Sequence, residues 1–232
     1  MKFVVWLAIP CKALARRGFV VLAPDSICFE DRRKNRSGVE PDAGDWLQHY
    51  NEMCYRLVQG DTLMRRVLQD AALGVSFLQN HPAVDQSCIG TLGHSYGGNT
   101  VLFLMALDQR IAFGCSSGAA CTYVCKMRSG TGIEMAEVIP DIVNRFDMAE
   151  VIQCIAPRPF LVVSATDDQY SKDADVIVSR AKETVATLGV ETHLEHHRYT
   201  GGHAISGERF AGIVEWLTKL AQQTKEDREP RN

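Results

Sequence analysis

The sequence predicts an α/β fold in which a mostly parallel central sheet is covered by helices on both faces. Short apolar runs alternate with longer amphipathic segments along the chain. Most of these runs are apolar throughout, which is typical of strands that are buried on both sides. A Gly-x-Ser-x-Gly segment also joins one apolar run to a helix-like stretch. With 232 residues, the chain is expected to form a single domain over residues 1–221.

Six segments are predicted to be strands because they are short and rich in apolar and β-branched residues. The last of them alternates between apolar and polar side chains, which favours a place nearer the edge of the sheet. These segments are residues 3–8, 19–23, 88–92, 111–115, 160–164 and 190–197.

The clearest predicted helix covers residues 62–79. Leu63, Val67 and Val75 belong to one apolar stripe along it, and Asp61 is expected to be its N-cap. Further helices are predicted near residues 100–107, 173–188 and 208–220. Residues 222–232 are polar and charged, so we expect a frayed tail there.

Two stretches lie outside this regular alternation. Residues 27–60 combine a charge run with a possible aromatic helix that contains Trp46, Tyr50 and Tyr55. They are predicted either to cap a pocket or to form a solvated loop followed by a packing helix. Residues 116–139 are rich in glycine and other small residues, and they are a candidate wall above the sheet.

Composition favours a small-molecule partner. The net charge of −3 and the pI of about 6.2 argue against a nucleic-acid-binding protein. Residues 1–9 resemble a short signal segment or a buried strand, and Pro10 before Cys11 favours the strand. We therefore expect no membrane association.

The eight cysteines are predicted to be buried free thiols. They include no Cys-x-x-Cys pair, and Cys115, Cys121 and Cys125 have no histidine nearby in the sequence. His193 and His197 share a strand face, but no cysteine pair accompanies them. The sequence therefore predicts no metal or other cofactor, and free thiols favour a cytoplasmic location.

The segment Gly93-His94-Ser95-Tyr96-Gly97 is predicted to be a nucleophile elbow. A serine in a sharp turn from strand to helix needs neighbours without bulk two residues before and after it. The start of the following helix would aim the Tyr96 N–H at an oxyanion that forms on Ser95. Because this five-residue pattern also arises by chance, its context has to support it.

A serine nucleophile requires a base and an acid that orients the base. His203 lies in a glycine-containing loop after the last predicted strand, and we expect it to be the base. Asp167 follows the strand at 160–164 and is the expected acid, with Asp168 as the alternative. His94 is expected to pack beside the nucleophile instead of acting as the base. The order Ser, Asp, His is that of the α/β-hydrolase fold.

The segments around Ser95, Asp167 and His203, together with residues 13–25 and 82–90, resemble the α/β-hydrolase superfamily. The likeness covers residues 13–220 and is strongest for dienelactone-hydrolase-like and acetyl-xylan-esterase-like proteins. Dienelactone hydrolases use a cysteine nucleophile, so Ser95 favours the esterase branch. The resemblance implies an α/β-hydrolase fold.

The sequence departs from this family pattern at its start. Family members usually have an initial pair of strands and then a strand ending in His-Gly, whose loop supplies a second oxyanion donor. Here residues 3–8 are followed almost at once by a helix-like segment. We expect the usual first strands to be absent, residues 3–8 to fill the inner strand position, and Ile9 or Cys11 to supply the second N–H.

The predicted function is hydrolysis of short-chain carboxylic esters, such as acetyl esters, through an acyl-enzyme. Ser95 would attack, His203 would accept its proton, Asp167 would hold the imidazolium, and Tyr96 and Ile9 would bind the oxyanion. Two alternatives stay open at this point. One is a peptidase of the same fold, and the other is a binding protein that retains a weakened hydrolase fold.

Overall fold

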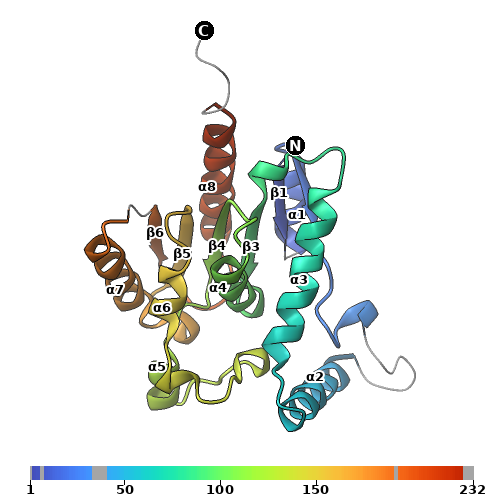
Figure 1. Ribbon diagram of the computed structural model, residues 1–232, viewed down its shortest axis with the longest axis vertical. Helices are drawn as coiled ribbons and strands as arrows, with labels where there is room; N and C mark the ends of the chain where they lie inside the picture. The colour runs from blue at the N-terminus through green and yellow to red at the C-terminus, as the bar shows by residue number, and fades with distance from the viewer. Residues whose placement is uncertain (1, 6–7, 33–40, 191–192, 227–232) are drawn as a thin grey trace.

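The computed structural model describes residues 2–5, 8–32, 41–190 and 193–226 (Figure 1). Apolar strand residues and amphipathic helices alternate along it, as the sequence predicts. Within the described residues the strands are β1 (Lys2–Val5), β2 (Phe19–Leu22), β3 (Gly90–His94), β4 (Phe113–Ser117), β5 (Phe160–Ala165) and β6 (Leu194–Tyr199).

All hydrogen-bonded strand pairs among the described residues are parallel. Strands β3, β4, β5 and β6 form a four-stranded sheet in that order, and β1 pairs with β2 in a separate two-stranded sheet. Strand β1 also packs beside β3, so the two sheets continue one another. Because parallel strands point the same way, the residues after β3, β5 and β6 gather at one edge.

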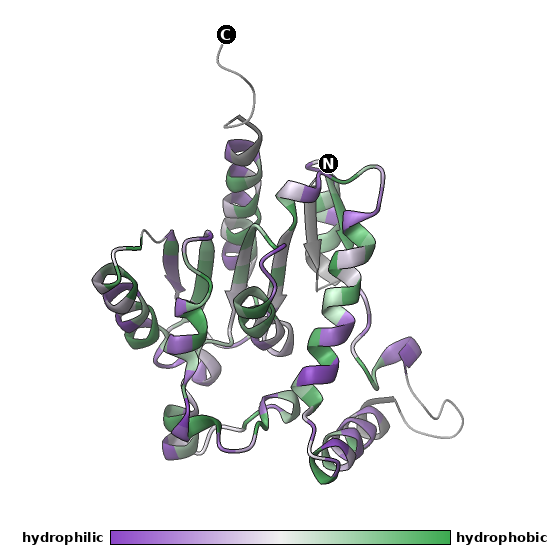
Figure 2. Cartoon of the chain, in the orientation of Figure 1, coloured by the Kyte–Doolittle hydropathy of each residue, from purple (hydrophilic) through white to green (hydrophobic). Residues whose placement is uncertain are grey.

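Helices cover both faces of these strands, which confirms the predicted fold class (Figure 1). One face carries the core formed with α3, α4, α6 and α7, and the other packs against α1 and α8. Figure 2 shows apolar and polar residues alternating along α3 and α8, as expected of amphipathic helices. The α-helices are α1 (Ala8–Ala15), α2 (Pro41–Val58), α3 (Leu63–Gln79), α4 (Tyr96–Leu107), α5 (Tyr123–Ser129), α6 (Met148–Gln153), α7 (Ala174–Thr187) and α8 (Gly207–Glu226).

Several boundaries differ from the sequence-based expectation, among them the N-cap of α3 and the end of α8. Thr62, not Asp61, caps α3, because its hydroxyl accepts a hydrogen bond from the Arg65 N–H at 3.2 Å. Asp61 instead accepts a hydrogen bond from the Thr62 N–H at 2.8 Å. Helix α8 continues to Glu226, so the expected polar tail is helical at its start, and residues 227–232 lie outside the described part.

The first strand occupies the inner position that the sequence analysis assigned to it. Strand β1 lies between β2, with which it pairs, and β3, beside which it packs. It ends at Val5 instead of Ala8, and Ala8 already belongs to α1. Residues 6 and 7, which join β1 to α1, lie outside the described residues.

The cysteines are not paired in disulfides, but fewer are buried than the sequence suggested. No disulfide joins any of the eight. Cys154 is exposed, whereas Cys11, Cys54 and Cys125 are partly exposed.

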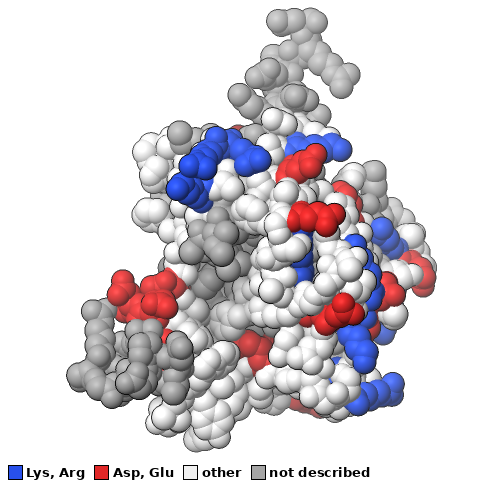
Figure 3. Space-filling model, turned by 180° about the vertical axis from the view of Figure 1, so that it is seen from behind, with Lys and Arg blue, Asp and Glu red and all other residues white. Residues whose placement is uncertain are grey.

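On the face shown in Figure 3, acidic and basic side chains of the described residues lie interspersed.

None of the helices in the described ranges combines the length and apolar character needed to cross a bilayer.

The turn from β3 to α4 is the tightest backbone feature of the fold. Ser95 has φ of 54° and ψ of −120°, and its N–H donates a hydrogen bond to the Ser117 carbonyl at 2.8 Å. A Cβ added to Gly93 would lie 2.0 Å from the carbonyl oxygen of Gly97. Backbone atoms cannot yield as a flexible side chain does, so position 93 accepts only glycine.

We expect Gly93→Ala to lower the free energy of unfolding by at least about 1–3 kcal/mol, because its methyl group would displace the backbone of α4. Gly207→Ala is the matched control, since a Cβ at Gly207 meets nothing within 4 Å. Thermal and urea unfolding of the two variants measure the difference. Equal stability of both variants would show that the elbow is less tightly constrained than its geometry indicates.

Candidate active site

Three polar side chains meet at the carboxyl edge of the sheet. Ser95 lies in the turn between β3 and α4, and His203 lies between β6 and α8. The Ser95 Oγ is 2.7 Å from His203 Nε2, and His203 Nδ1 is 3.0 Å from Asp168 Oδ1. With its hydrogen on Nδ1, the imidazole donates to the carboxylate and accepts from the serine hydroxyl. This is the arrangement that activates a serine nucleophile.

The carboxylate in this chain of contacts is Asp168, so the preference for Asp167 as the partner of His203 is wrong. The loop after β5 turns so that the Asp167 N–H donates to the Gly201 carbonyl at 2.9 Å and its carboxylate is exposed. The Asp167 carboxylate accepts only from the neighbouring Thr166 hydroxyl, at 3.1 Å, among its described contacts. The turn leaves the next residue, Asp168, directed at His203.

Asp168 is buried and held by several donors. It is the N-cap of the short 3₁₀ helix η5 (Gln169–Ser171), where its Oδ1 accepts from the Tyr170 N–H and its Oδ2 from the Ser171 hydroxyl, both at 3.0 Å. Burial acts to raise the pKa of Asp168, but hydrogen bonds from His203, Tyr170 and Ser171 outweigh burial and lower it. Asp168 is therefore ionised at neutral pH.

A buried arginine supports this group of residues from behind, and sequence reasoning missed it. Arg209 is 1% exposed, and its Nη2 lies 3.7 Å from Asp168 Oδ2. Its Nη1 donates to the carbonyls of Gly202 and His203, each at 3.4 Å. One guanidinium thus contacts both Asp168 and the loop that carries His203. The only sequence signal is a lone arginine at the start of an amphipathic helix.

The imidazole of His94 packs against that of His203. Its ring centre is 4.8 Å from that of His203, and its Nδ1 is 3.1 Å from the Ser117 hydroxyl. Burial, together with the nearby charges of Arg209 and His203, lowers the pKa of His94 to about 4. His94 is therefore neutral above that pH.

Gly118 separates His94 from Asp168. A Cβ there would come within 2.8 Å of the His94 ring and 3.1 Å of Asp168 Oδ2. Its φ of 62° also favours glycine. This glycine lets the acid and the two imidazoles approach one another.

The two predicted oxyanion donors, Tyr96 and Ile9, each lie at the start of a helix. Tyr96 is the first residue of α4, and the first N–H groups of a helix have no acceptor within it. Ile9 lies in the first turn of α1, and its side chain is outside the described part of the chain. Tyr96 therefore begins a helix directly after Ser95, and the oxyanion roles of Tyr96 and Ile9 both stay predictions.

A cavity of about 400 Å³ opens beside Ser95 and His203. Helix α2 contributes Trp46 to the wall of this cavity. It belongs to residues 27–60, which are predicted either to cap a pocket or to form a loop and a packing helix. Residues 33–40 lie outside the described residues. The segment after β4 contributes Gly118 and Ala119, and the stretch around α5 and the 3₁₀ helix η3 (Met135–Glu137) adds a polar wall. The side chain of Tyr96 is fixed by Ser26, whose hydroxyl donates a hydrogen bond to the Tyr96 hydroxyl at 2.8 Å.

One group of potential metal ligands occurs among the described residues. Ligand atoms of Cys121, Cys125 and Asp173 lie within 4.8 Å of one another. Both oxygens of Asp173 already accept hydrogen bonds from Thr122, at 3.1 Å from its N–H and 2.6 Å from its hydroxyl. The Asp173 carboxylate therefore fixes Thr122, the N-cap of α5.

A curated protein of related sequence is "Putative hydrolase YtaP" of Bacillus subtilis (strain 168). It is 24% identical over 219 residues, which cover 88% of this chain and 67% of that protein.

Solved structures share the fold at lower identity. A glucuronoyl esterase from Solibacter usitatus superposes with a TM-score of 0.64 and 17% identity over 91% of this chain. This chain spans only 62% of the length of that esterase. Acetyl xylan esterase 1 from Thermoanaerobacterium sp. JW/SL YS485 superposes with a TM-score of 0.59 and 16% identity, covering 95% of this chain and 75% of that one.

These likenesses confirm the α/β-hydrolase fold. Residues 55–224, which include Ser95, Asp168 and His203, match the prolyl oligopeptidase family. Because the match spans well over half of the sequence, the chain belongs to the prolyl oligopeptidase family.

Proposed function

We propose that this protein is a serine hydrolase that cleaves short-chain carboxylic esters through an acyl-enzyme. The observation that supports this most is the continuous set of contacts from Ser95 through His203 to Asp168. Their separations of 2.7 and 3.0 Å are within hydrogen-bonding range before any substrate is bound. The strained backbone of Ser95 adds support, because such strain concentrates at functional sites.

The proposed reaction has two halves. Ser95 Oγ attacks the ester carbonyl while His203 Nε2 accepts its proton, and the Asp168 carboxylate stabilises the imidazolium. The N–H of Tyr96 donates to the oxyanion, and His203 then protonates the leaving alcohol. A water molecule, deprotonated by His203, attacks the acyl-enzyme and releases the acid.

The preference for a small acyl group rests on the residues that line the cavity near the nucleophile. Gly118 and Ala119 have little or no side chain, and both border the same cavity as Ser95. The names of the two esterase structures, which refer to glucuronoyl and acetyl xylan esters, are compatible with ester hydrolysis. An acetyl ester is therefore the first substrate to test.

A peptidase is the second candidate, and the family match favours it. It would use the same three residues, because acyl transfer from an amide also needs a nucleophile, a base and an oxyanion site. The two candidates differ in the bond they cleave. Rates on the 4-nitrophenyl ester and the 4-nitroanilide of the same short acyl group distinguish them directly.

We expect the hydrolysis of 4-nitrophenyl acetate to fall by about 10⁴-fold or more in Ser95→Ala and in His203→Ala. His193→Ala is the matched control, since His193 is exposed and borders neither Ser95 nor the cavity. Initial rates at saturating and limiting ester give kcat and kcat/KM for each variant. Wild-type rates in Ser95→Ala would exclude the proposed mechanism and favour a binding protein.

We expect Asp168→Asn to lower kcat by about 10³- to 10⁴-fold, because the amide would favour the wrong tautomer of His203. Asp167→Asn makes the same chemical change one residue away on an exposed side chain, and its kcat is expected to stay within about threefold of wild type. The labelling rate of Ser95 by a fluorophosphonate provides a second measurement that needs no substrate. A larger loss in Asp167→Asn would reverse the assignment of the acid.

A further inference from the structure

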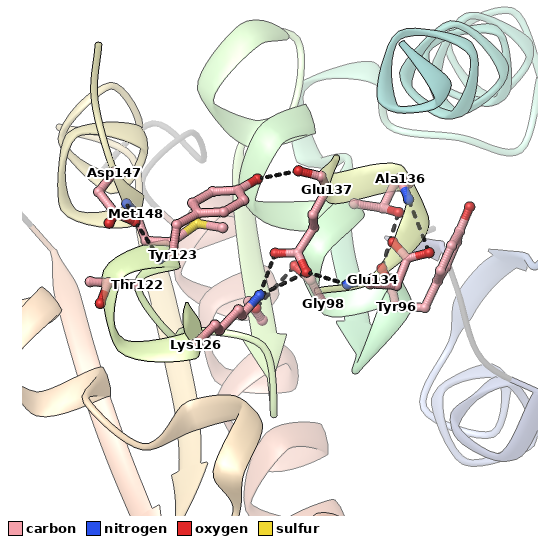
Figure 4. Close-up of polar contacts among 12 residues, drawn as sticks. Tyr96, Gly98, Thr122, Tyr123, Lys126, Glu134, Ala136, Glu137, Asp147 and Met148 are labelled. Carbon is pink, nitrogen blue, oxygen red and sulfur yellow. Dashed lines mark hydrogen bonds and ion pairs between the residues drawn. The ribbon is translucent and has the colours of Figure 1, made fainter. Parts of the chain in front are cut away.

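The wall of the cavity includes a polar cluster that the proposed reaction does not use. Lys126, Glu134 and Glu137 all line the cavity that Ser95 borders. They come from α5 and from η3 and its N-cap. Figure 4 shows the side chains of Lys126 and Glu137 directed toward each other, whereas the Glu134 carboxylate turns toward the Ala136 N–H. Charged side chains are rarely buried without a partner, so each member's contacts identify its role.

Lys126 and Glu137 neutralise each other. The lysine Nζ lies 2.6 and 2.7 Å from the two carboxylate oxygens of Glu137, and the exposed fractions are only 2% and 1% (Figure 4). The backbone of Glu137 is fixed as well, because the Tyr123 hydroxyl donates to its carbonyl at 2.8 Å. This pair therefore forms a rigid support without net charge.

Glu134 is the remaining charge of the cluster. Its N–H donates to Glu137 Oε2 at 3.4 Å, and its Oε1 accepts from the Ala136 N–H at 3.1 Å (Figure 4). The same Oε1 lies 3.2 Å from His49 Nε2. The other oxygen, Oε2, is buried and has no hydrogen-bond partner among the described residues. Half of this carboxylate is thus left without a donor.

Two further acceptors share this condition. With its hydrogen on Nε2, His49 donates to Glu134, and its buried Nδ1 then has no donor in the described part of the chain. Asn99, one helical turn after Ser95, lines the cavity, and its buried Oδ1 is also unpartnered. A buried acceptor without a donor costs free energy. Of these residues, Glu134 and Asn99 line the cavity, so a bound group that donates hydrogen bonds to them would stabilise the site.

We propose that this cluster recognises a hydrogen-bond-donating group, an ammonium or a hydroxyl, on the alcohol portion of the ester, and that it disfavours anionic alcohols. The inference rests on the proposed ester hydrolysis and names the substrate class of that site. Since the acyl group is taken to be small, most of the 400 Å³ cavity is available to the alcohol. Glu134 attracts a cation and repels a carboxylate, whereas its unpartnered oxygen accepts from either kind of donor.

The test uses trans-4-substituted cyclohexyl acetates at pH 7, in which only the remote substituent differs. The four substituents are ammonium, hydroxyl, hydrogen and carboxylate, and release of acetate gives kcat/KM for each. We expect the ammonium ester to exceed the carboxylate ester by on the order of 10- to 100-fold. If the hydroxyl and ammonium esters have equal kcat/KM, the site recognises the substituent by hydrogen bonding. If kcat/KM is higher for the ammonium ester, the site also recognises its charge. The proposal would be overturned if kcat/KM for the carboxylate ester or for the unsubstituted ester equalled that for the ammonium ester.

Glu134→Gln removes the unbalanced charge and keeps the shape of the side chain. Its ammonium-to-carboxylate ratio of kcat/KM is expected to fall by about tenfold or more. Glu183→Gln is the matched control on the outer surface of α7, where the carboxylate is exposed, and it is expected to keep the wild-type ratio. An unchanged ratio in Glu134→Gln would assign the selectivity to another part of the cavity and contradict the proposal.

Binding to Ser95→Ala separates this inference from the proposed function. In that variant the acetates are not expected to turn over, so calorimetric titration measures their Kd directly. Tighter binding of the ammonium or hydroxyl ester than of the carboxylate ester supports the cluster's role even if the wild type cleaves no ester. Ester hydrolysis by the wild type without any such difference in Kd would sustain the hydrolase and refute the donor-recognition site.

Discussion

The turn at Ser95 is the constraint on which the site depends. A non-glycine residue with φ of 54° costs on the order of 1–3 kcal/mol, so the surrounding structure has to hold it in place. Here the Ser95 N–H is fixed by Ser117 of β4, and the close approach of Gly93 to Gly97 leaves no room for relaxation. The Ser95 hydroxyl is therefore held at a position that the sheet determines, and the loop after β6 brings His203 to it.

Asp168 is held differently, by the balance of charges inside the protein. Asp168 would resist ionisation because it is buried, but donors from His203 and η5 surround it and Arg209 lies behind it. The guanidinium is itself buried, and Asp168 is the carboxylate that opposes it at 3.7 Å. Burial lowers the pKa of Arg209 and Asp168 acts against that shift. Each of the two charges thus makes the burial of the other tolerable, and both fix the loop of His203.

Local patterns predicted the fold and part of the site, because strands, helices and the elbow follow from neighbours in the sequence. The strand before Ser95 and the loop of His203 could be predicted without knowing any distant contact. The choice between Asp167 and Asp168 depended on a backbone bond from Asp167 to Gly201, 34 residues away in sequence, which no local pattern reports. Arg209 and the contact of His49 with Glu134, separated by 85 residues, were missed for the same reason.

The same reasoning explains why the cavity is polar on one side. Close packing of His94 and Asp168 needs the glycine at position 118, which supplies no hydrogen-bonding side chain to the cavity. The polar part of the cavity wall comes instead from segments outside the sheet and includes Glu134, the N-cap of η3, which His49 of α2 contacts. A site divided in this way can change its substrate by altering the outer segments while the elbow and its partners stay as they are.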